Sequence, residues 1–315
     1  MKKVVYITGC LGFIGSHITR DCLKNGWFVR GIDKQSYAAN INLLKEFNQY
    51  PNFVYENKDI NDIQFLHDCD YIINTAAETH VDNSISRNDV FIKSNVCGTH
   101  NLLELIRVTK KEKMPVLIHF STDEVYGDIE SGSHTEDCLL KPSNPYSASK
   151  AAADQLVLAW NRTYGIPYVI VRPTNNYGNG QYIEKLIPKS IKYLQLGRKI
   201  PLHNKGNPRR TWLHVEDTSN AVICIINSGI VNSIFNIPGK EELKNIEVVE
   251  KIIKVFHGRV SSVEDFIDLN YDRKGQDVRY SIDGSKLKSI GWETNKIFED
   301  EIIKIVENSK NIFVW

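Results

Sequence analysis

The first fifteen residues constrain the fold of this chain more than any other segment. A β-branched run, Val4 to Thr8, leads directly into glycines at positions 9, 12 and 15, and a helical stretch follows. In a strand–turn–helix unit, Gly9 would permit a tight turn, Gly12 would let the backbone approach a pyrophosphate, and Gly15 would let the helix pack on the strand. Free N–H groups at the start of the helix can bind phosphate oxygens. The segment therefore predicts a dinucleotide site.

A second strand ends in an acidic residue where dinucleotide sites distinguish NAD from NADP. Residues 27–32 read WFVRGI, and Asp33 follows them, eighteen residues after Gly15. An acid here accepts hydrogen bonds from the adenosine ribose and repels a 2′-phosphate. We therefore expect NAD, although Lys34 beside the acid leaves some tolerance of a phosphate open.

Strand-like and helix-like segments alternate through the first half of the chain. Apolar runs that read as strands lie at residues 53–57, 71–75, 116–120 and 168–171. Such alternation predicts a parallel sheet with right-handed crossovers. The expected fold class is therefore α/β, with a Rossmann-type doubly wound parallel sheet and a smaller C-terminal α/β domain for the substrate.

The length of 315 residues is sufficient for two domains. We place the NAD-binding domain at residues 1–175, joined by about 212–238, which include a returning strand at Ser233 to Ile237. A second, substrate-binding domain would comprise residues 176–211 and 239–315. Residues 212–222 (WLHVEDTSNAV) read as the start of a helix.

Polar residues follow the apolar run at 116–120. Residues 121–124 read Ser-Thr-Asp-Glu and would lie at the carboxyl end of a strand, where ligands bind in open α/β folds. Tyr146 and Lys150 follow with the i to i+4 spacing that places a phenol and an ammonium group on one face of a helix. A fixed cation nearby favours the phenolate, so Tyr146 could take a proton from a sugar hydroxyl as a hydride leaves its carbon.

Composition limits the partners of the chain. With 39 basic and 38 acidic residues, no global charge attracts nucleic acid or a membrane surface. No apolar stretch reaches the roughly 18 to 20 residues of a membrane span. Six cysteines without a C-x-x-C pair indicate neither a metal site nor a disulfide framework, and we expect buried thiols. Because Met1-Lys2-Lys3 leads directly into a strand, we expect no signal peptide and a cytoplasmic location.

Together these segments resemble the extended short-chain dehydrogenase/reductase superfamily. Within it they resemble the nucleotide-sugar 4,6-dehydratases, most closely the dTDP-glucose 4,6-dehydratases. The resemblance runs nearly end to end and is carried by strings that include TGCLGFIGS, STDEVYGD, NPYSASKAAADQL, NNYGNGQYIEKLIP, RRTWLHVED and DRKGQDVRYSID. STDEVYGD is the discriminating string, because 4-epimerases and decarboxylases of the superfamily lack its Asp-Glu pair.

The resemblance implies a lyase that converts a dTDP- or UDP-hexose to its 4-keto-6-deoxy derivative with NAD as cofactor. Tyr146, assisted by Thr122 and Lys150, would deprotonate the 4-hydroxyl while a hydride passes from C4 to NAD. Glu124 would then remove the C5 proton, and Asp123 would protonate the departing C6 hydroxyl. The hydride would finally return to C6. Two adjacent acids suit this chemistry, because one must act ionised and the other protonated.

The resemblance also implies two sets of binding residues. NAD would be held by Gly9, Gly12, Phe13, Ile14, Gly15, Asp33, Lys34, Asp59, Ile60, Ala76, Ala77, Asn95, Tyr146 and Lys150. The nucleotide sugar would be held by His80, Ser84, Asn175, Asn176, Glu184, Lys185, His203, Arg210, Asn245 and Arg273. A helix N-cap is the alternative role for Asp59. The family is usually dimeric through two long helices, for which residues 94–111 and 147–160 are the candidates.

Several points stay open at this stage. His203 stands where relatives often carry tyrosine, and Lys274 and Gln276 replace the Pro and His of the family string. The substrate could therefore be dTDP-glucose, UDP-glucose or a UDP-N-acetylhexosamine such as UDP-GlcNAc. Dehydration with C5 epimerisation, a 4-epimerase of the same superfamily and a non-catalytic NAD-binding scaffold are the alternatives, and the scaffold is disfavoured because the complete catalytic set is present.

Overall fold

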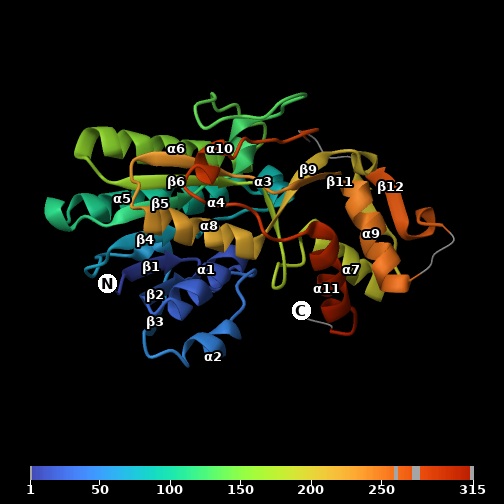
Figure 1. Ribbon diagram of the computed structural model, residues 1–315, viewed down its shortest axis with the longest axis horizontal. Coiled ribbons are helices and arrows are strands. Elements are labelled where there is room, and N and C mark those ends of the chain that lie inside the picture. Colours follow the sequence, from blue (N-terminus) through green and yellow to red (C-terminus); the bar gives the residue numbers. More distant parts are fainter. Residues whose placement is uncertain (1, 259–261, 272–276, 313–315) are drawn as a thin grey trace.

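A seven-stranded parallel sheet forms the core of the larger lobe, on the left in Figure 1. The computed structural model describes residues 2–258, 262–271 and 277–312. The strand order is β10-β6-β5-β4-β1-β2-β3, and every neighbouring pair is parallel. The strands are β1 (Val4–Thr8), β2 (Phe28–Asp33), β3 (Phe53–Asn57), β4 (Tyr71–Asn74), β5 (Val116–Phe120), β6 (Tyr168–Pro173) and β10 (Ser233–Ile237).

Helices cover both faces of this sheet, because side chains alternate along each strand. Val5 and Ile7 of β1 belong to one buried cluster, together with residues of α1 and α8. Tyr6 belongs to the cluster on the other face, together with residues of α5 and α6. The helices are α1 (Phe13–Lys24), α5 (Gly98–Arg107), α6 (Pro145–Tyr164) and α8 (Val215–Ser228). The predicted α/β class with a doubly wound parallel sheet is confirmed.

The second half of the chain adds a lobe with its own apolar core, which lies beside the sheet in Figure 1. Its two small sheets have the orders β11-β9-β7 and β12-β8. The elements are β7 (Asn175–Tyr177), α7 (Leu186–Gln195), β8 (Ile200–His203), β9 (Arg209–His214), β11 (Glu241–Lys244), α9 (Asn245–His257), β12 (Ile267–Tyr271) and α11 (Phe298–Lys310). The domain boundaries given above stay a prediction.

Short elements complete the described chain. The helices are α2 (Leu43–Phe47), α3 (Val81–Ser86), α4 (Asn88–Phe91) and α10 (Ser285–Lys288). A π-helical segment, η2 (Ile92–Cys97), joins α4 to α5, and the 3-10 turns are η1 (Ile60–Asp62), η3 (Lys111–Lys113), η4 (Asp123–Tyr126), η5 (Asn204–Gly206) and η6 (Glu264–Phe266).

Two expectations need correction. Residues 212–214 are not helical: they continue β9, which pairs with β7 and β11, and α8 begins only at Val215. The side chain of His214 caps this helix by accepting a hydrogen bond from the N–H of Glu216 over 3.3 Å. Not all the thiols are buried: Cys10 and Cys22 are, but Cys97 is exposed and the other three are intermediate.

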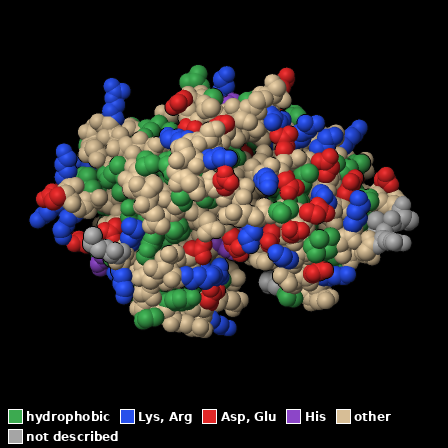
Figure 2. Space-filling view, viewed as in Figure 1, with side chains coloured by type: hydrophobic (Ala, Val, Ile, Leu, Met, Phe, Trp, Pro, Cys, Tyr) green, Lys and Arg blue, Asp and Glu red, His purple; other side chains and the backbone are tan. Residues whose placement is uncertain are grey.

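The surface carries charges of both signs. Figure 2 shows Lys and Arg side chains interspersed with Asp and Glu over the visible face. This distribution agrees with the near balance of basic and acidic residues. Within the described ranges, no helix is both long and apolar enough to cross a membrane.

Candidate active site

One cavity of about 420 Å³ collects most of the predicted site residues. It lies at the carboxyl end of the central sheet, beside the C-terminal lobe, and its volume is in the range of small-molecule sites. Its lining includes Gly9, Gly12, Phe13, Ile14, Gly15, Asp33, Lys34, Asp59, Ile60, Ala76, Ala77, His80, Thr122, Asp123, Glu124, Tyr146, Asn175, Asn176, Glu184, Lys185, His203, Arg210 and Asn245. Residues predicted from distant segments therefore meet in one place.

Three predicted residues lie outside this lining. Lys150 is 3% exposed, one helical turn after Tyr146. Asn95 bonds both backbone groups of Glu78 and donates to the hydroxyl of Ser149, so it connects the segment after β4 to α6. Ser84 is fully buried and donates to a carbonyl of its own helix. Spacing placed Lys150 near the site, and the resemblance placed Asn95 and Ser84 there, but neither could show how deeply these side chains lie. Arg273 falls outside the described residues.

The glycine turn after β1 fits closely against its neighbours. A Cβ atom on Gly15 would stand 2.1 Å from the carbonyl oxygen of Gly9, and one on Gly9 would stand 2.9 Å from the backbone of Ala76. Gly9 also has φ of +72°, a conformation that side chains rarely adopt. Gly12 caps α1 without a side-chain hydrogen bond, so the first N–H groups of the helix face the cavity rim without a side-chain acceptor. This turn can hold a pyrophosphate.

Acidic side chains occupy the ends of β2 and β3. The carboxylate of Asp33 accepts backbone hydrogen bonds from Leu11 over 3.0 Å and from Gln35 over 2.8 Å, and burial raises its pKa. Asp59 caps η1 by accepting from the N–H of Asn61 over 2.9 Å, so it has a capping role, but for a three-residue 3-10 turn and not for a helix over residues 61–69. The Lys34 amine lies 3.5 Å from Asp59, so an acid already faces this cation.

Thr122, Asp123 and Glu124 follow β5 in the 3-10 turn η4. The Thr122 hydroxyl donates to Oδ1 of Asp123 over 3.2 Å and accepts from the N–H of Glu124 over 3.4 Å. Burial, and then the charge of Glu124, raise the pKa of Asp123 to about 7. Burial also raises the pKa of Glu124, which Arg210 opposes. Asp123, which can hold a proton near neutral pH, therefore lies beside a second carboxyl group, as general acid and base chemistry requires.

Tyr146 stands in the first turn of α6, which has a strong start signal. The Asn144 side chain accepts from the N–H of Ser147 over 2.9 Å, the Ser147 hydroxyl lies 3.2 Å from the N–H of Asn144, and a proline follows the cap. Burial, with the charges of Glu124 and Asp123, raises the pKa of the phenol, and its hydrogen bond with Thr122 opposes the rise.

The phenolate that the sequence predicts at Tyr146 is therefore not favoured in the protein without ligands. Burial lowers the pKa of the Lys150 amine to about 8, with the charge of Asp154 opposing that fall. At Tyr146, burial and the charges of Glu124 and Asp123 raise the pKa, so the phenol keeps its proton at neutral pH.

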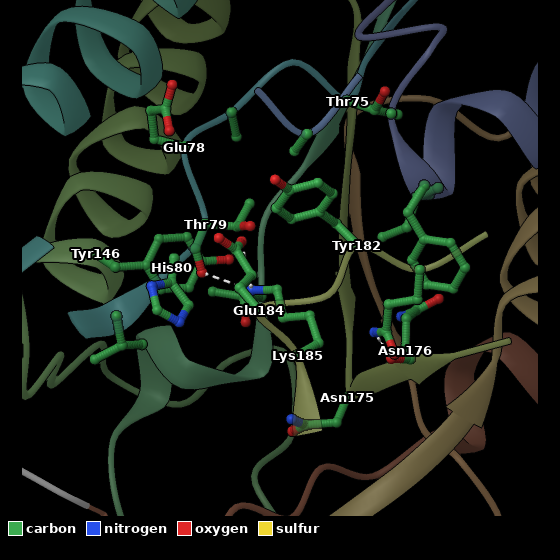
Figure 3. A pocket seen from close by; sticks show the side chains of 18 of the residues that line it. Thr75, Glu78, Thr79, His80, Tyr146, Asn175, Asn176, Tyr182, Glu184 and Lys185 are labelled. Carbon is green, nitrogen blue, oxygen red and sulfur yellow. Dashed lines mark hydrogen bonds and ion pairs between the residues drawn. The ribbon is translucent and has the colours of Figure 1, made fainter. Parts of the chain in front are cut away.

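Residues of the C-terminal lobe form the opposite wall (Figure 3). The Lys185 amine donates to the carbonyl of Thr79 over 3.0 Å, the contact drawn as a dashed line. The Arg210 guanidinium donates to the carbonyl of Asp277 over 3.0 Å and lies 4.4 Å from the ring centre of Tyr280. A fixed guanidinium suits recognition of a diphosphate.

Several contacts of the Glu124 carboxylate were not predicted from the sequence. The Tyr280 hydroxyl lies 3.4 Å from Oε2 of Glu124, and the side-chain amide of Asn144 donates to the same oxygen over 3.3 Å. Tyr280 also donates to Asp277, which accepts from Ser143 as well. The strings NPYSASK and RYSID contain Asn144 and Tyr280, but only the tertiary fold brings these two residues to Glu124.

Comparison with known proteins connects this arrangement to a family. Residues 6–305 match the family described as GDP-mannose 4,6 dehydratase. The dTDP-glucose 4,6-dehydratase of Haemophilus influenzae is 38% identical over 326 residues, covering 96% of each chain. A low-salt glycan biosynthesis protein of Haloferax volcanii is 39% identical over 308 residues, covering 96% of this chain and 97% of its own.

Solved structures have the same architecture. The dTDP-glucose 4,6-dehydratase of Streptomyces venezuelae, solved with NAD bound, superimposes with a TM-score of 0.91 at 36% identity and covers 98% of this chain and 97% of its own. A UDP-glucuronic acid 4-epimerase of Bacillus cereus superimposes with a TM-score of 0.88 at 23% identity, covering 97% and 99% of the two chains. The second likeness shows the fold alone.

Proposed function

The chain belongs to the GDP-mannose 4,6-dehydratase family, and from this premise we propose that it is an NAD-dependent nucleotide-sugar 4,6-dehydratase, a hydro-lyase. The observation that carries the proposal is the pair of adjacent carboxyl groups, Asp123 and Glu124, in one cavity with Tyr146 and the glycine turn. A hydride transfer alone needs no such pair. Removal of water from neighbouring carbons needs both an acid and a base.

NAD fits the residues at the carboxyl ends of β1 and β2. A Cβ atom on Gly15 would stand 2.1 Å from the carbonyl oxygen of Gly9, so no side chain fits at this position of the glycine turn. Asp33 at the strand end disfavours a 2′-phosphate. The acid facing Lys34 leaves that amine less suited to bind a phosphate, which also supports NAD over NADP.

For the substrate we propose a nucleotide-diphosphate hexose, with dTDP-glucose first. The relatives that are 36% and 38% identical and bear the name dTDP-glucose 4,6-dehydratase favour it. Arg210 is the candidate for the diphosphate, because a fixed guanidinium binds phosphate oxygens well. UDP-glucose and UDP-GlcNAc stay as alternatives, since His203 departs from the family pattern in the same wall.

The reaction assigns one task to each side chain. When bound, NAD would accept a hydride from sugar C4 and later return it to C6. Tyr146 takes the proton of the 4-hydroxyl, with Thr122 hydrogen-bonded to the phenol. Lys150 supplies a positive charge one helical turn after Tyr146 in α6. The phenol has to lose its proton for this step, so the ligands in the cavity must lower its pKa.

Elimination then uses the two acids. The 4-ketone makes the C5 proton acidic, and Glu124 removes it as base. Asp123, whose pKa is about 7, gives a proton to the departing C6 hydroxyl, which leaves as water. Glu124 then gives its proton back to C5 while C6 would receive the hydride from the cofactor, and the product is a 4-keto-6-deoxy sugar. The net redox change is zero.

A panel of nucleotide sugars tests this proposal. The purified protein is incubated separately with dTDP-glucose, UDP-glucose, UDP-GlcNAc and GDP-mannose, and the products are analysed by mass spectrometry. We expect at least dTDP-glucose to give a product lighter by one water, without added NAD being consumed. A product of unchanged mass but altered sugar configuration would instead indicate a 4-epimerase. No change with any sugar that binds would indicate a non-catalytic scaffold. Dehydration coupled to C5 epimerisation would be seen in the product configuration.

We further propose a homodimer in the cytoplasm. The helices α5 and α6 pack against each other, and Val108 and Tyr164 at their ends are exposed, with Ile92 nearby in η2. Free thiols, as all six cysteines are, are typical of reducing compartments. Light scattering should give twice the 36.0 kDa mass of the chain, and a mass of 36.0 kDa at micromolar concentration would contradict the dimer.

A further inference from the structure

A carboxylate that the proposed reaction does not use lies directly behind the site. Asp154 follows Lys150 by four residues and Tyr146 by eight, so the three side chains share one face of α6. Its side chain is fully buried. A buried charge without partners is strongly destabilising, so its partners identify what it connects.

One oxygen of Asp154 joins α6 to two strands. Oδ2 accepts from Nε and Nη2 of Arg172 in β6, over 3.1 and 2.9 Å. The same oxygen accepts from the hydroxyl of Ser121 over 3.0 Å. Ser121 directly follows β5 and directly precedes the segment 122–124, which carries the threonine and the two acids. Asp154 therefore helps to fix the position of this segment relative to the face of α6.

The other oxygen faces a buried histidine. Nε2 of His119 lies 3.6 Å from Oδ1 of Asp154, and among the described residues neither atom has a hydrogen-bond partner. The amide nitrogen of Asn74 lies 3.3 Å from Nδ1 of His119, and Oδ1 of Asn74 accepts from the hydroxyl of Thr8. Nδ1 therefore accepts and Nε2 carries the hydrogen that faces Asp154. The network extends through β5 and β4 to β1, at the residue before the glycine turn.

Several charged and titratable side chains surround Lys150. The titratable and charged groups around Lys150 are Tyr146 and Asp154 on its own helix, His119 on β5 and Arg172 on β6. Burial keeps His119 neutral by lowering its pKa, and Asp154 is the negative group that opposes the loss of the Lys150 proton.

We propose that Asp154 is a positioning residue of the reaction, which fixes the segment 122–124 relative to Tyr146 and holds Lys150 as the ammonium ion. It acts only through these neighbours and contacts no substrate. The inference rests on the proposed function, because Lys150 and the acids obtain their roles there. If Asp154 only formed a structural ion pair, its replacement would lower the stability of the protein without changing how the reaction depends on pH.

The test uses Asp154→Asn, which keeps the shape and one acceptor oxygen but removes the charge. The single-turnover rate of reduction of bound NAD by dTDP-glucose is measured between about pH 6 and pH 9, together with the melting temperature. We expect the rate at pH 8 to fall about tenfold, and its alkaline decline to move about one pH unit lower. Glu301→Gln is the matched control, since Glu301 is a 7% exposed carboxylate in α11 that binds Lys304. It should leave the pH profile unchanged.

A second variant keeps the test decisive if Asp154→Asn does not fold. Ser121→Ala removes the hydroxyl that joins the segment after β5 to Asp154, and it leaves the pair of Asp154 and Arg172 intact. It should slow reduction of bound NAD about threefold or more with little change in melting temperature. A wild-type rate in Ser121→Ala would overturn the positioning role. So would a folded Asp154→Asn variant whose rate falls equally at all pH values or does not fall at all.

A measurement without substrate separates this inference from the proposed function. The pKa of Lys150 is followed by NMR of its isotope-labelled ε-carbon in the wild type, Asp154→Asn and Glu301→Gln. We expect a fall of about one unit in Asp154→Asn alone. An unchanged value would overturn the inference even if the enzyme is active. A lowered value in a protein that converts no nucleotide sugar would overturn the proposed function, and with it the role in that reaction, but would still show that Asp154 holds Lys150 as the ammonium ion.

Discussion

The phenol of Tyr37 donates a hydrogen bond to Oε2 of Glu184 over 3.0 Å, although the two residues are 147 positions apart. Tyr37 lies between β2 and α2, whereas Glu184 lies between β7 and α7. The ring of Tyr182 packs edge to face against Tyr37, with 5.4 Å between ring centres. Since Glu184 and Tyr182 line the cavity, this contact joins its two sides at the rim.

The first prediction concerns release of the cofactor. Tyr37→Phe should keep the ring contact and lose the hydrogen bond, which contributes about 0.5–1.5 kcal/mol in a typical case. If the rim contact retains NADH, its dissociation should accelerate about two- to tenfold, as measured by the fluorescence of bound NADH after displacement with NAD. Tyr164→Phe, on the exposed end of α6, should leave the rate unchanged. Equal rates in the wild type and Tyr37→Phe would show that this contact does not retain the cofactor.

The second prediction separates oxidation from elimination. In Glu124→Gln the amide cannot remove the C5 proton, whereas Tyr146 and Lys150 are unchanged. Bound NAD should therefore still be reduced on addition of dTDP-glucose, and water loss should slow about 10²- to 10⁴-fold. Absorbance of NADH and mass spectrometry of the sugar report the two steps separately. Water loss at the wild-type rate would refute the assignment of Glu124 as base.

The third prediction concerns stability and pH at Asp123. Its pKa is about 7 in the folded protein against a usual value of 3.8, a difference that corresponds to roughly 4 kcal/mol at most. A raised folded pKa gives stability that is complete below pH 3.8 and is lost as the pH rises through 7. At about pH 8 the ionised carboxylate is therefore destabilising.

Asp123→Asn should reverse this loss. Its free energy of unfolding in urea should exceed that of the wild type at about pH 8 by about 1–4 kcal/mol, and the difference should shrink toward pH 4. Water elimination should slow greatly because the proton donor is absent. In the wild type, the elimination rate should decline as the pH rises above about 7. If the difference in free energy of unfolding between Asp123→Asn and the wild type does not depend on pH, the raised pKa of Asp123 is contradicted.

The fourth prediction tests the glycine turn. A methyl group in Gly15→Ala would overlap the carbonyl of Gly9 at 2.1 Å and the hydroxyl of Thr75 at 2.6 Å. We expect loss of bound NAD and a decrease in the free energy of unfolding of about 1–3 kcal/mol or more. Gly132→Ala is the control for NAD content, because no atom lies within 4 Å of the new Cβ. Its φ of +76° strains an alanine, so this variant can lose stability but should keep its NAD. Full NAD content in Gly15→Ala would show that the turn does not approach the cofactor closely.

Local patterns predicted the parts of the site that depend on a single element and its end. The glycine turn, Asp33 and the segment 122–124 each follow directly from a buried strand, and the parallel sheet brings strand ends to one edge. Periodicity gives the face of a helix but not the depth of its side chains. For that reason Lys150 was expected near the ligands but lies behind the cavity lining, as does Ser84, which the resemblance had placed near the sugar.

Contacts between distant segments could not be predicted in the same way. Tyr280 reaches Glu124 across 156 positions, and no local pattern distinguishes it from other tyrosines. Residues 212–214 looked helical because acids follow them, yet pairing with β7 and β11 extends them as a strand. Lys274, Gln276 and Arg273 lie outside the described residues, so the expectations about them stay predictions.

The fate of one hydrogen tests the central claim, that a bound nicotinamide carries a hydride from C4 to C6 while water leaves between the two transfers. dTDP-glucose labelled with deuterium at C4 is converted by the wild-type protein, and the product is analysed by NMR. The account predicts deuterium at C6 of a 4-keto-6-deoxy sugar. Deuterium that stays at C4, or that is lost to solvent while water is eliminated, would contradict it.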